Sequence, residues 1–110
     1  NIEDNLEKRI HNLSSVLIKL YSKNQNIIRW SLRNIWRDKN LRKNMFSWNK
    51  ILRSYVYSIL PEILEKKKPE REIIFECTSF IFFLRLKIVQ SLSEDQIKEI
   101  FVLNTKKYLS

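Results

Sequence analysis

The chain has 110 residues and a formal net charge of +9 at pH 7, and 44% of its residues are hydrophobic; this length fits one domain and is too short for two. It contains one cysteine, one histidine and no glycine, which excludes an internal disulfide and an ordinary structural zinc site and disfavours β-hairpins, whose tight turns depend on glycine. We therefore expect an all-α fold, a single compact bundle of about five helices over residues 1–110. Because the chain does not begin with methionine, we also expect it to be a fragment of a longer protein.

The first predicted helix covers residues 4–22, where large aliphatic side chains recur at alternating spacings of four and three residues. This is the a/d pattern of a helix in a bundle or a coiled coil. We expect the apolar seam at 6–20 to face the core, or to join a second helix in a homo- or hetero-oligomer. The polar residues 22–26 are expected to connect this helix to the next. The seam consists of Leu6, Ile10, Leu13, Leu17 and Leu20.

Two further helices are predicted on either side of a polar, basic connection. On a helical wheel the first of them places its arginines on a different face from its aliphatic residues. Trp36 and Trp48 fall on apolar faces and are expected in the core. Trp30 borders the arginines and is the one tryptophan whose exposure the pattern leaves open. The predicted boundaries are 26–38 for the second helix, 38–44 for the connection and 45–60 for the third helix.

The most apolar part of the chain follows Pro61, which either kinks the third helix or begins a short new one. From Ile73 to Val89, 12 of 17 residues are apolar and surround nearly the whole helical wheel. Since a helix that is apolar all round is normally buried, we expect a central, mostly buried helix over 70–91. A β-strand at 78–90 is the alternative, and we prefer the helix because no other segment offers a strand partner.

The last predicted helix begins at Ser93, where Gln96 three residues later completes a capping box. Two other features of the C-terminal half have alternative interpretations. The lysine run 66–68 is either an exposed loop or helix end, or a localisation signal or second phosphate contact. Cys77 lies in an apolar run and is expected to be a small buried hydrophobic residue.

The positive charge is concentrated in the middle of the chain. Residues 19–60 hold ten cations against the single anion Asp38, whereas charges nearly cancel before and after this segment. Arginine binds phosphate and carboxylate through the fork geometry of its guanidinium group. We therefore predict a basic binding surface on this segment. Its candidate residues are Arg29, Arg33, Arg37, Lys39, Arg42, Lys43, Lys50, Arg53 and Trp30.

Three partners could match this surface. The first is the phosphate backbone of DNA or RNA, contacted with little sequence readout. The second is an acidic or helical segment of a protein, which would make the chain a docking domain of a larger complex. The third is an anionic membrane surface. Against all three stands a face that is merely solvated, or whose cations pair with Glu62, Glu65 or Glu72.

Catalysis has little support in the sequence, so we expect a non-enzymatic chain without a cofactor or metal. It has no glycine-rich phosphate loop, no nucleophile elbow and no His–Glu metal spacing. Its longest apolar run, residues 80–84, is far shorter than the roughly 20 residues that cross a bilayer. The cysteine content and the basic charge favour an intracellular setting, nuclear rather than cytoplasmic.

Overall fold

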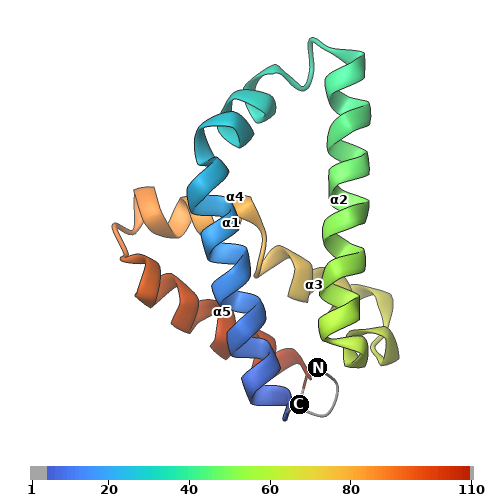
Figure 1. The fold of residues 1–110 in the computed structure, drawn as a ribbon, viewed down its shortest axis with the longest axis vertical. Coiled ribbons are helices and arrows are strands. Elements are labelled where there is room, and N and C mark those ends of the chain that lie inside the picture. The colour runs from blue at the N-terminus through green and yellow to red at the C-terminus, as the bar shows by residue number, and fades with distance from the viewer. Residues whose placement is uncertain (1–4, 110) are drawn as a thin grey trace.

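The structure is a computed structural model that describes residues 5–109, and within this range every regular element is helical (Figure 1). The all-α prediction is therefore confirmed for the described residues, and the strand alternative for 78–90 is wrong. The number and boundaries of the helices differ from the prediction. In chain order the elements are α1 (Leu6–Asn34), α2 (Lys39–Ile59), the 3-10 helix η1 (Pro61–Glu65), α3 (Lys68–Glu76), α4 (Phe80–Leu84), the π-helical turn η2 (Arg85–Val89) and α5 (Glu94–Leu109).

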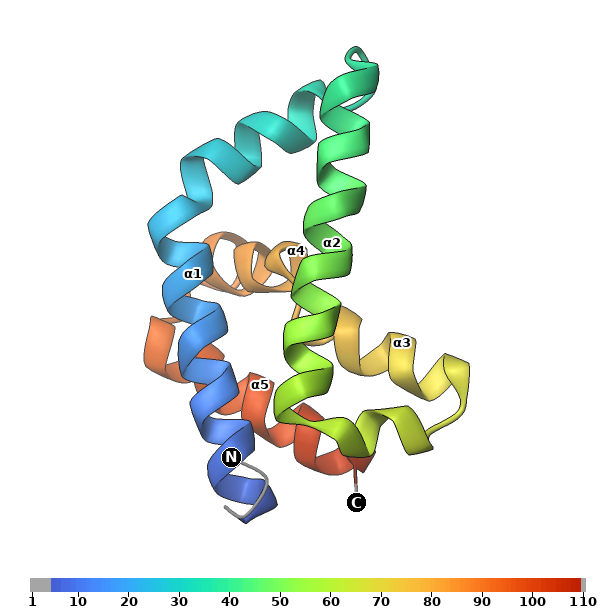
Figure 2. The same ribbon diagram turned by 45° about the vertical axis from the view of Figure 1, so that its right-hand side comes forward.

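The core forms where the N-terminal half of α1 crosses α5 (Figures 1 and 2). Ile10 and Leu17 of α1 and Ile97 and Phe101 of α5 are at most 1% exposed. The a/d seam of α1 therefore faces the core of its own chain, as one interpretation predicted. It is not the free oligomerisation surface that the other interpretation required, because its central residues are already covered by α5 and its neighbours.

The predicted connection at 22–26 is instead helical, so the first two predicted helices form the single helix α1. This stretch has no glycine or proline, and its polar side chains bond either within the helix or to α5, so the helix is left intact. Asn24 Nδ2 donates to the carbonyl of Leu20 at 2.9 Å, and Ser22 Oγ donates to Glu94 at 2.7 Å. The polar composition therefore marks the end of the core-facing seam, and the helix itself continues.

Likewise, α2 begins at Lys39, six residues before the predicted start. The Asp38 carboxylate accepts from the backbone N–H groups of Asn40 and Leu41 at 2.9 and 3.1 Å. This is the bonding of an N-cap, which satisfies backbone donors that the first turn of a helix leaves free. The predicted connection at 38–44 is thus mostly the first turns of α2.

The predicted central helix over 70–91 is broken at Cys77–Ser79 and is not mostly buried. Ser79 caps α4 by accepting from Phe82 N–H at 3.2 Å, and Tyr21 of α1 donates its hydroxyl to the Thr78 carbonyl at 2.7 Å. These bonds satisfy the backbone at the break. The two apolar pieces turn in different directions, and their outer residues remain exposed, for example Val89 at 70%. Cys77 is half-buried rather than buried.

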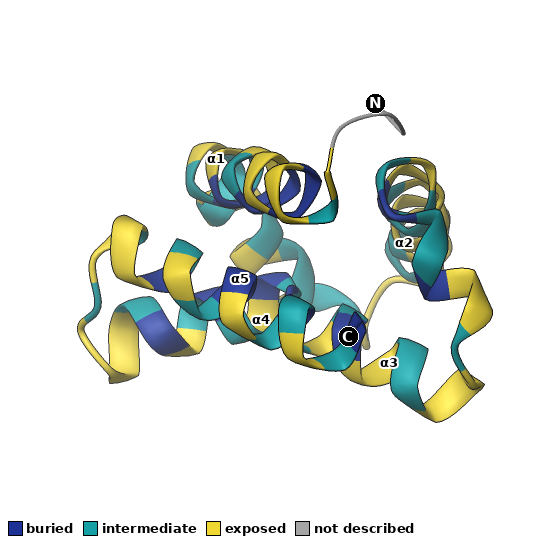
Figure 3. Ribbon diagram, turned by 90° about the horizontal axis from the view of Figure 1, so that it is seen from below, coloured by how far each residue is buried: buried dark blue, intermediate teal, exposed yellow. Residues whose placement is uncertain are grey.

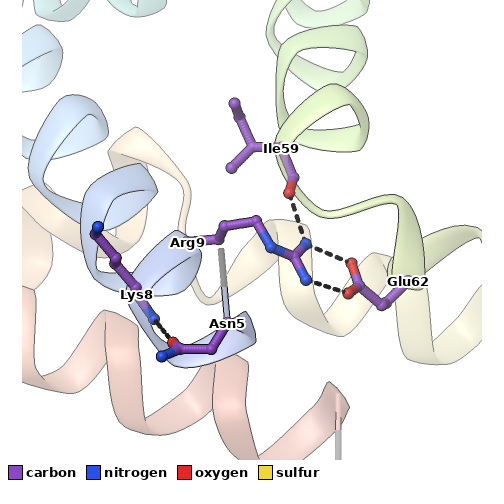
Figure 4. A network of polar contacts seen from close by, with 5 residues as sticks. All are labelled: Asn5, Lys8, Arg9, Ile59 and Glu62. Atoms are coloured by element: carbon purple, nitrogen blue, oxygen red, sulfur yellow. Dashed lines mark hydrogen bonds and ion pairs between the residues drawn. The ribbon is translucent and has the colours of Figure 1, made fainter. Parts of the chain in front are cut away.

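Polar contacts fasten the lower part of the molecule. Arg9, whose side chain is buried, binds the Glu62 carboxylate through both terminal nitrogens and donates to the Ile59 carbonyl at 3.0 Å (Figure 4).

Two predictions for the C-terminal half can be compared with the structure. Pro61 begins a short 3-10 helix, the second of its two predicted alternatives. The capping box is confirmed: Gln96 N–H donates to Ser93 Oγ at 3.2 Å, and Ser93 N–H donates back to Gln96 Oε1 at 2.9 Å.

Burial is confined to the lower part of the fold. Viewed from below, the buried positions of α1, α2 and α5 turn toward one another (Figure 3). The last turns of α1 and the first turns of α2 extend beyond α3, α4 and α5 (Figures 1 and 2). We call this helical hairpin, residues 27–51, the arm. None of its residues is buried.

Candidate nucleic-acid interface

The arm exposes two tryptophans that the sequence pattern assigned to the core. Trp36 is 83% exposed and Trp48 is 64% exposed, so this prediction is wrong. The wheel correctly separated an apolar from a basic face. However, the helices carry these faces past the end of the core, where no other element covers them. Trp30, whose exposure was left open, is 50% exposed.

Arg29, Arg33 and Arg37, which follow one another at four-residue spacing and are called here the arginine ladder, divide between a helix and a turn. Arg29 and Arg33 lie four residues apart on α1 and are exposed, so their side chains are neighbours on the helix surface. Since α1 ends at Asn34, Arg37 lies in the turn, where its N–H donates to the Asn34 carbonyl at 3.0 Å. The ladder therefore continues around the tip of the arm instead of along one straight helix.

A second row of cations lies on α2. Lys39, Lys43, Phe46 and Lys50 follow one another at spacings of four, three and four residues, and all four are exposed. These spacings place them on one side of an α-helix. We call this row the lysine stripe. It was not recognised from the sequence because residues 38–44 were assigned to a connection; Asp38 as an N-cap was the signal that could have revealed it.

Within residues 5–109, none of the exposed cations of the arm forms an ion pair. Glu62 pairs with Arg9, Glu72 with Arg53, Glu94 with Lys87 and Glu7 with Lys106. Asp38, the one acidic residue of the arm, uses its carboxylate to cap α2. Internal pairing with Glu62, Glu65 or Glu72 therefore does not describe these cations, and a merely solvated face is the alternative to a binding role. They are Arg29, Arg33, Arg37, Lys39, Lys43 and Lys50.

Arg53, by contrast, is part of the fold. Its two terminal nitrogens donate to the Glu72 carboxylate at 2.6 and 3.0 Å, and its guanidinium carbon lies 4.3 Å from the centre of the Phe75 ring. The hydrogen bond from Arg53 lowers the pKa of Glu72 below its ordinary value. The Arg53 side chain thus joins α2 to α3, so it is not counted among the cations of the binding surface.

Arg42 also has an internal role. Its Nη1 donates to the carbonyls of Ile35 and Trp36, both at 3.1 Å. Carbonyls at the end of a helix lack partners within the helix, so this guanidinium completes the end of α1 and holds the turn between the two arm helices. Without Arg42 and Arg53, six of the eight predicted cations are left as candidates for the binding surface.

Aromatic rings accompany the six cations. Trp30 precedes Arg33 by three residues on α1, and Trp36 directly precedes Arg37 in the turn. Phe46 lies within the lysine stripe and is 70% exposed. Of these three rings, only Trp30 was predicted from the sequence to be a site residue. Trp36 was assigned to the core, and Phe46 was missed because its row of lysines was not recognised.

A groove of about 410 Å³ lies on a different side of the arm helices. Its walls come from α1, α2 and the break between α3 and α4, and they are mostly apolar. The partly exposed lining residues Ile27, Trp48 and Ile81 open it to solvent. None of the six cations lines it. The arm therefore has a basic, aromatic outside and an apolar inside.

Other functional groups form no comparable site. Burial, followed by the charge of Glu76, raises the pKa of the Cys77 thiol, which disfavours the reactive thiolate. Within the described range, His, Cys, Asp and Glu side chains do not gather in threes that could hold a metal ion. None of the helices described combines the length and the apolar character needed to cross a membrane. No protein family, curated protein or solved structure matches the chain.

Proposed function

We propose that this chain is a non-enzymatic binding module whose arm contacts the phosphate backbone of nucleic acid. The six exposed cations of the arm supply the contacts, with guanidinium groups on α1 and the turn and ammonium groups on α2. The observation that carries the proposal is that these cations have no acidic partner in the described chain and that the arm buries none of its residues. Their positive charge is therefore available to a ligand and is not used by the fold.

Nucleic acid fits this charge because its phosphates repeat regularly along a strand. Cations that neutralise phosphates release condensed counterions, and this release dominates non-specific affinity. Arginine adds two-point hydrogen bonds to phosphate oxygens. Six contacts predict a salt slope, in log affinity against log salt concentration, of about −5 for duplex DNA and about −4 for a single strand.

The test is a salt titration of binding to a duplex and to a single strand of DNA and RNA. An Arg29→Ser/Arg33→Ser/Arg37→Ser variant should bind more weakly, with a slope about 2 to 3 units flatter. The matched control is Lys66→Ser/Lys67→Ser/Lys68→Ser, which removes the same charge outside the arm. It should bind nearly as wild type. Circular dichroism checks that both variants keep their helices.

Two results would contradict the proposal. One is the absence of binding at low salt to every oligonucleotide. The other is an equal loss of affinity in the two triple variants, which would mean that overall charge matters and the arm does not.

The groove favours a second candidate function, the docking of an acidic, amphipathic helix from a partner protein. The groove extends along α1 from Leu17 to Leu32, about 22 Å at the rise of an α-helix, long enough for about four turns of a partner helix. Apolar side chains of that helix would fill it, and the net charge of +9 favours an acidic partner. The test is a Leu/Glu amphipathic peptide, which should bind wild type and lose affinity for a Trp48→Ser variant. A peptide that binds both equally would exclude this groove as the docking site.

A further inference from the structure

We infer that the arm binds unpaired, single-stranded nucleic acid and that the rings of Trp30, Trp36 and Phe46 stack on its bases. The inference rests on the proposed function, because it takes the phosphate contacts of the arm as given. It adds the class of nucleic acid and a second group of contact residues. The observation behind it is that three large rings stand exposed among cations that lack acidic partners.

The exposure of these rings is not explained by folding. Trp30, Trp36 and Phe46 are 50%, 83% and 70% exposed, and no described residue of the chain forms an aromatic pair or cation–π contact with any of them. Large aromatic side chains normally contribute to a core by burial. These three contribute almost nothing to the core of this chain, so their faces are available for stacking.

Their placement matches the chemistry of a single strand. On the lysine stripe, Phe46 lies between Lys43 and Lys50 at spacings of three and four residues, so ring and ammonium groups are neighbours on one helix side. On α1, Trp30 and Arg33 have the same three-residue relationship. Each nucleotide of a single strand offers one phosphate and one base. Cations that hold the phosphates therefore bring the bases within reach of the adjacent rings.

Duplex nucleic acid offers less to this surface. Its bases are paired and stacked on one another, so the three rings have no exposed base face to cover. The phosphate contacts remain in both cases. Stacking therefore predicts a preference for single strands, with all additional affinity depending on the aromatic residues.

A membrane surface fits the basic, aromatic side of the arm less well. A helix that lies in a membrane interface needs a continuous apolar face. On the lysine stripe three of the four positions are lysines, and Phe46 is isolated among them. Trp30 and Trp36 are likewise next to arginines in the helix or turn. The aromatic residues are therefore dispersed among charges and do not form one face.

The experiment compares wild type with Trp30→Leu, Trp36→Leu and Phe46→Leu, singly and combined, in binding to an oligothymidylate of about 12 nucleotides and to a duplex of the same length. Leucine keeps the helix propensity and removes the ring. Each substitution should weaken single-strand binding roughly 5- to 100-fold, with little change for the duplex. The control is Trp48→Leu, which removes an exposed indole that faces the groove; it should leave both affinities unchanged.

The outcomes separate the inference from the proposed function. If duplex and single strand bind equally and the aromatic variants bind as wild type, while the arginine variant weakens both, the stacking inference is wrong and the phosphate contacts stand. If neither oligonucleotide binds, both fail. If wild type instead binds vesicles of equimolar phosphatidylglycerol and phosphatidylcholine and the aromatic variants do not, the rings belong to a membrane interface and the inference is overturned. The single variants keep the test valid should the combined variant unfold.

Discussion

Arg9 in the first turns of α1 holds Glu62 of η1 through both of its terminal guanidinium nitrogens, although the two residues are 53 positions apart. The same guanidinium also donates a hydrogen bond to the Ile59 carbonyl at the end of α2. One side chain therefore joins the beginning of α1 to the end of α2 (Figure 4). These ends of the two helices lie opposite the tip of the arm (Figure 1). The two helices that continue into the arm are thus joined at their far ends, in the core, and the arm itself has no partner among the described residues where it meets solvent.

This contact predicts that Glu62→Gln destabilises the fold. The change keeps the size of the side chain but puts a neutral amide in place of the carboxylate that binds the Arg9 cation, whose side chain is only 7% exposed. Breaking such a pair leaves a charge in a poorly solvated place. We expect a loss of about 1–3 kcal/mol in the free energy of unfolding, measured by urea denaturation. Glu65→Gln, in the same 3-10 helix but exposed, should change little; equal effects of the two would show that the ion pair contributes nothing.

Ion pairs also predict how stability depends on pH. Four described glutamates have a pKa below the ordinary 4.5; for Glu62 the main cause is the hydrogen bond from Arg9. A carboxyl whose pKa is lowered in the folded state contributes stability that is fully present above its unfolded value. That stability is lost as the pH falls through the folded pKa. The four residues are Glu7, Glu62, Glu72 and Glu94.

The urea midpoint should therefore be constant near neutral pH and fall below about pH 4.5. In Glu62→Gln the decrease should be smaller, because one of the four contributing carboxyls has been removed. A midpoint that rises on acidification would contradict the assignment of these carboxylates as stabilising partners.

Arg53 and Arg33 should have opposite roles. Arg53→Ser removes the Glu72 pair and uncovers Phe75, so we expect a loss of about 1–2 kcal/mol of folding stability with little effect on nucleic-acid affinity. Arg33→Ser removes a cation without a partner, so we expect unchanged stability and weaker binding. Urea denaturation and a salt titration of both variants make the comparison. If Arg53→Ser and Arg33→Ser lost nucleic-acid affinity to a similar extent, Arg53 would belong to the binding surface after all.

Ser91 should be a site where glycine stabilises the chain. Its φ of 55° is the one positive value among the described residues, and a side chain in this region costs roughly 1–2 kcal/mol. After subtraction of the extra backbone freedom that glycine has in the unfolded chain, Ser91→Gly should raise the free energy of unfolding by about 0.5–1 kcal/mol. The opposite sign is expected for Ser54→Gly, an exposed position inside α2. Thermal denaturation compares the two variants.

Sequence alone was enough for features that depend on neighbouring residues. Ser93 and Gln96 cap α5 as predicted because the two side chains reach each other within one helical turn. The a/d seam of α1 faces the core because the spacing of its apolar residues matches the helical repeat. The charge of the middle segment follows from composition. The absence of glycine and the helical periodicity together predicted the all-α class.

Tertiary structure decided where each helix stops contributing to the core. Trp36 and Phe46 lie where α3–α5 do not cover them, so both are exposed. Trp36 is exposed although it falls on the apolar face of the helical wheel, where a core residue would be expected. Arg53 is used by the fold because α3 brings Glu72 against it from 19 positions away, whereas Arg33 meets no carboxylate of the described chain. A helical pattern records which side of a helix is apolar. It does not record how far the neighbouring elements extend along that side, and this extent separates the core of the protein from its candidate binding surface.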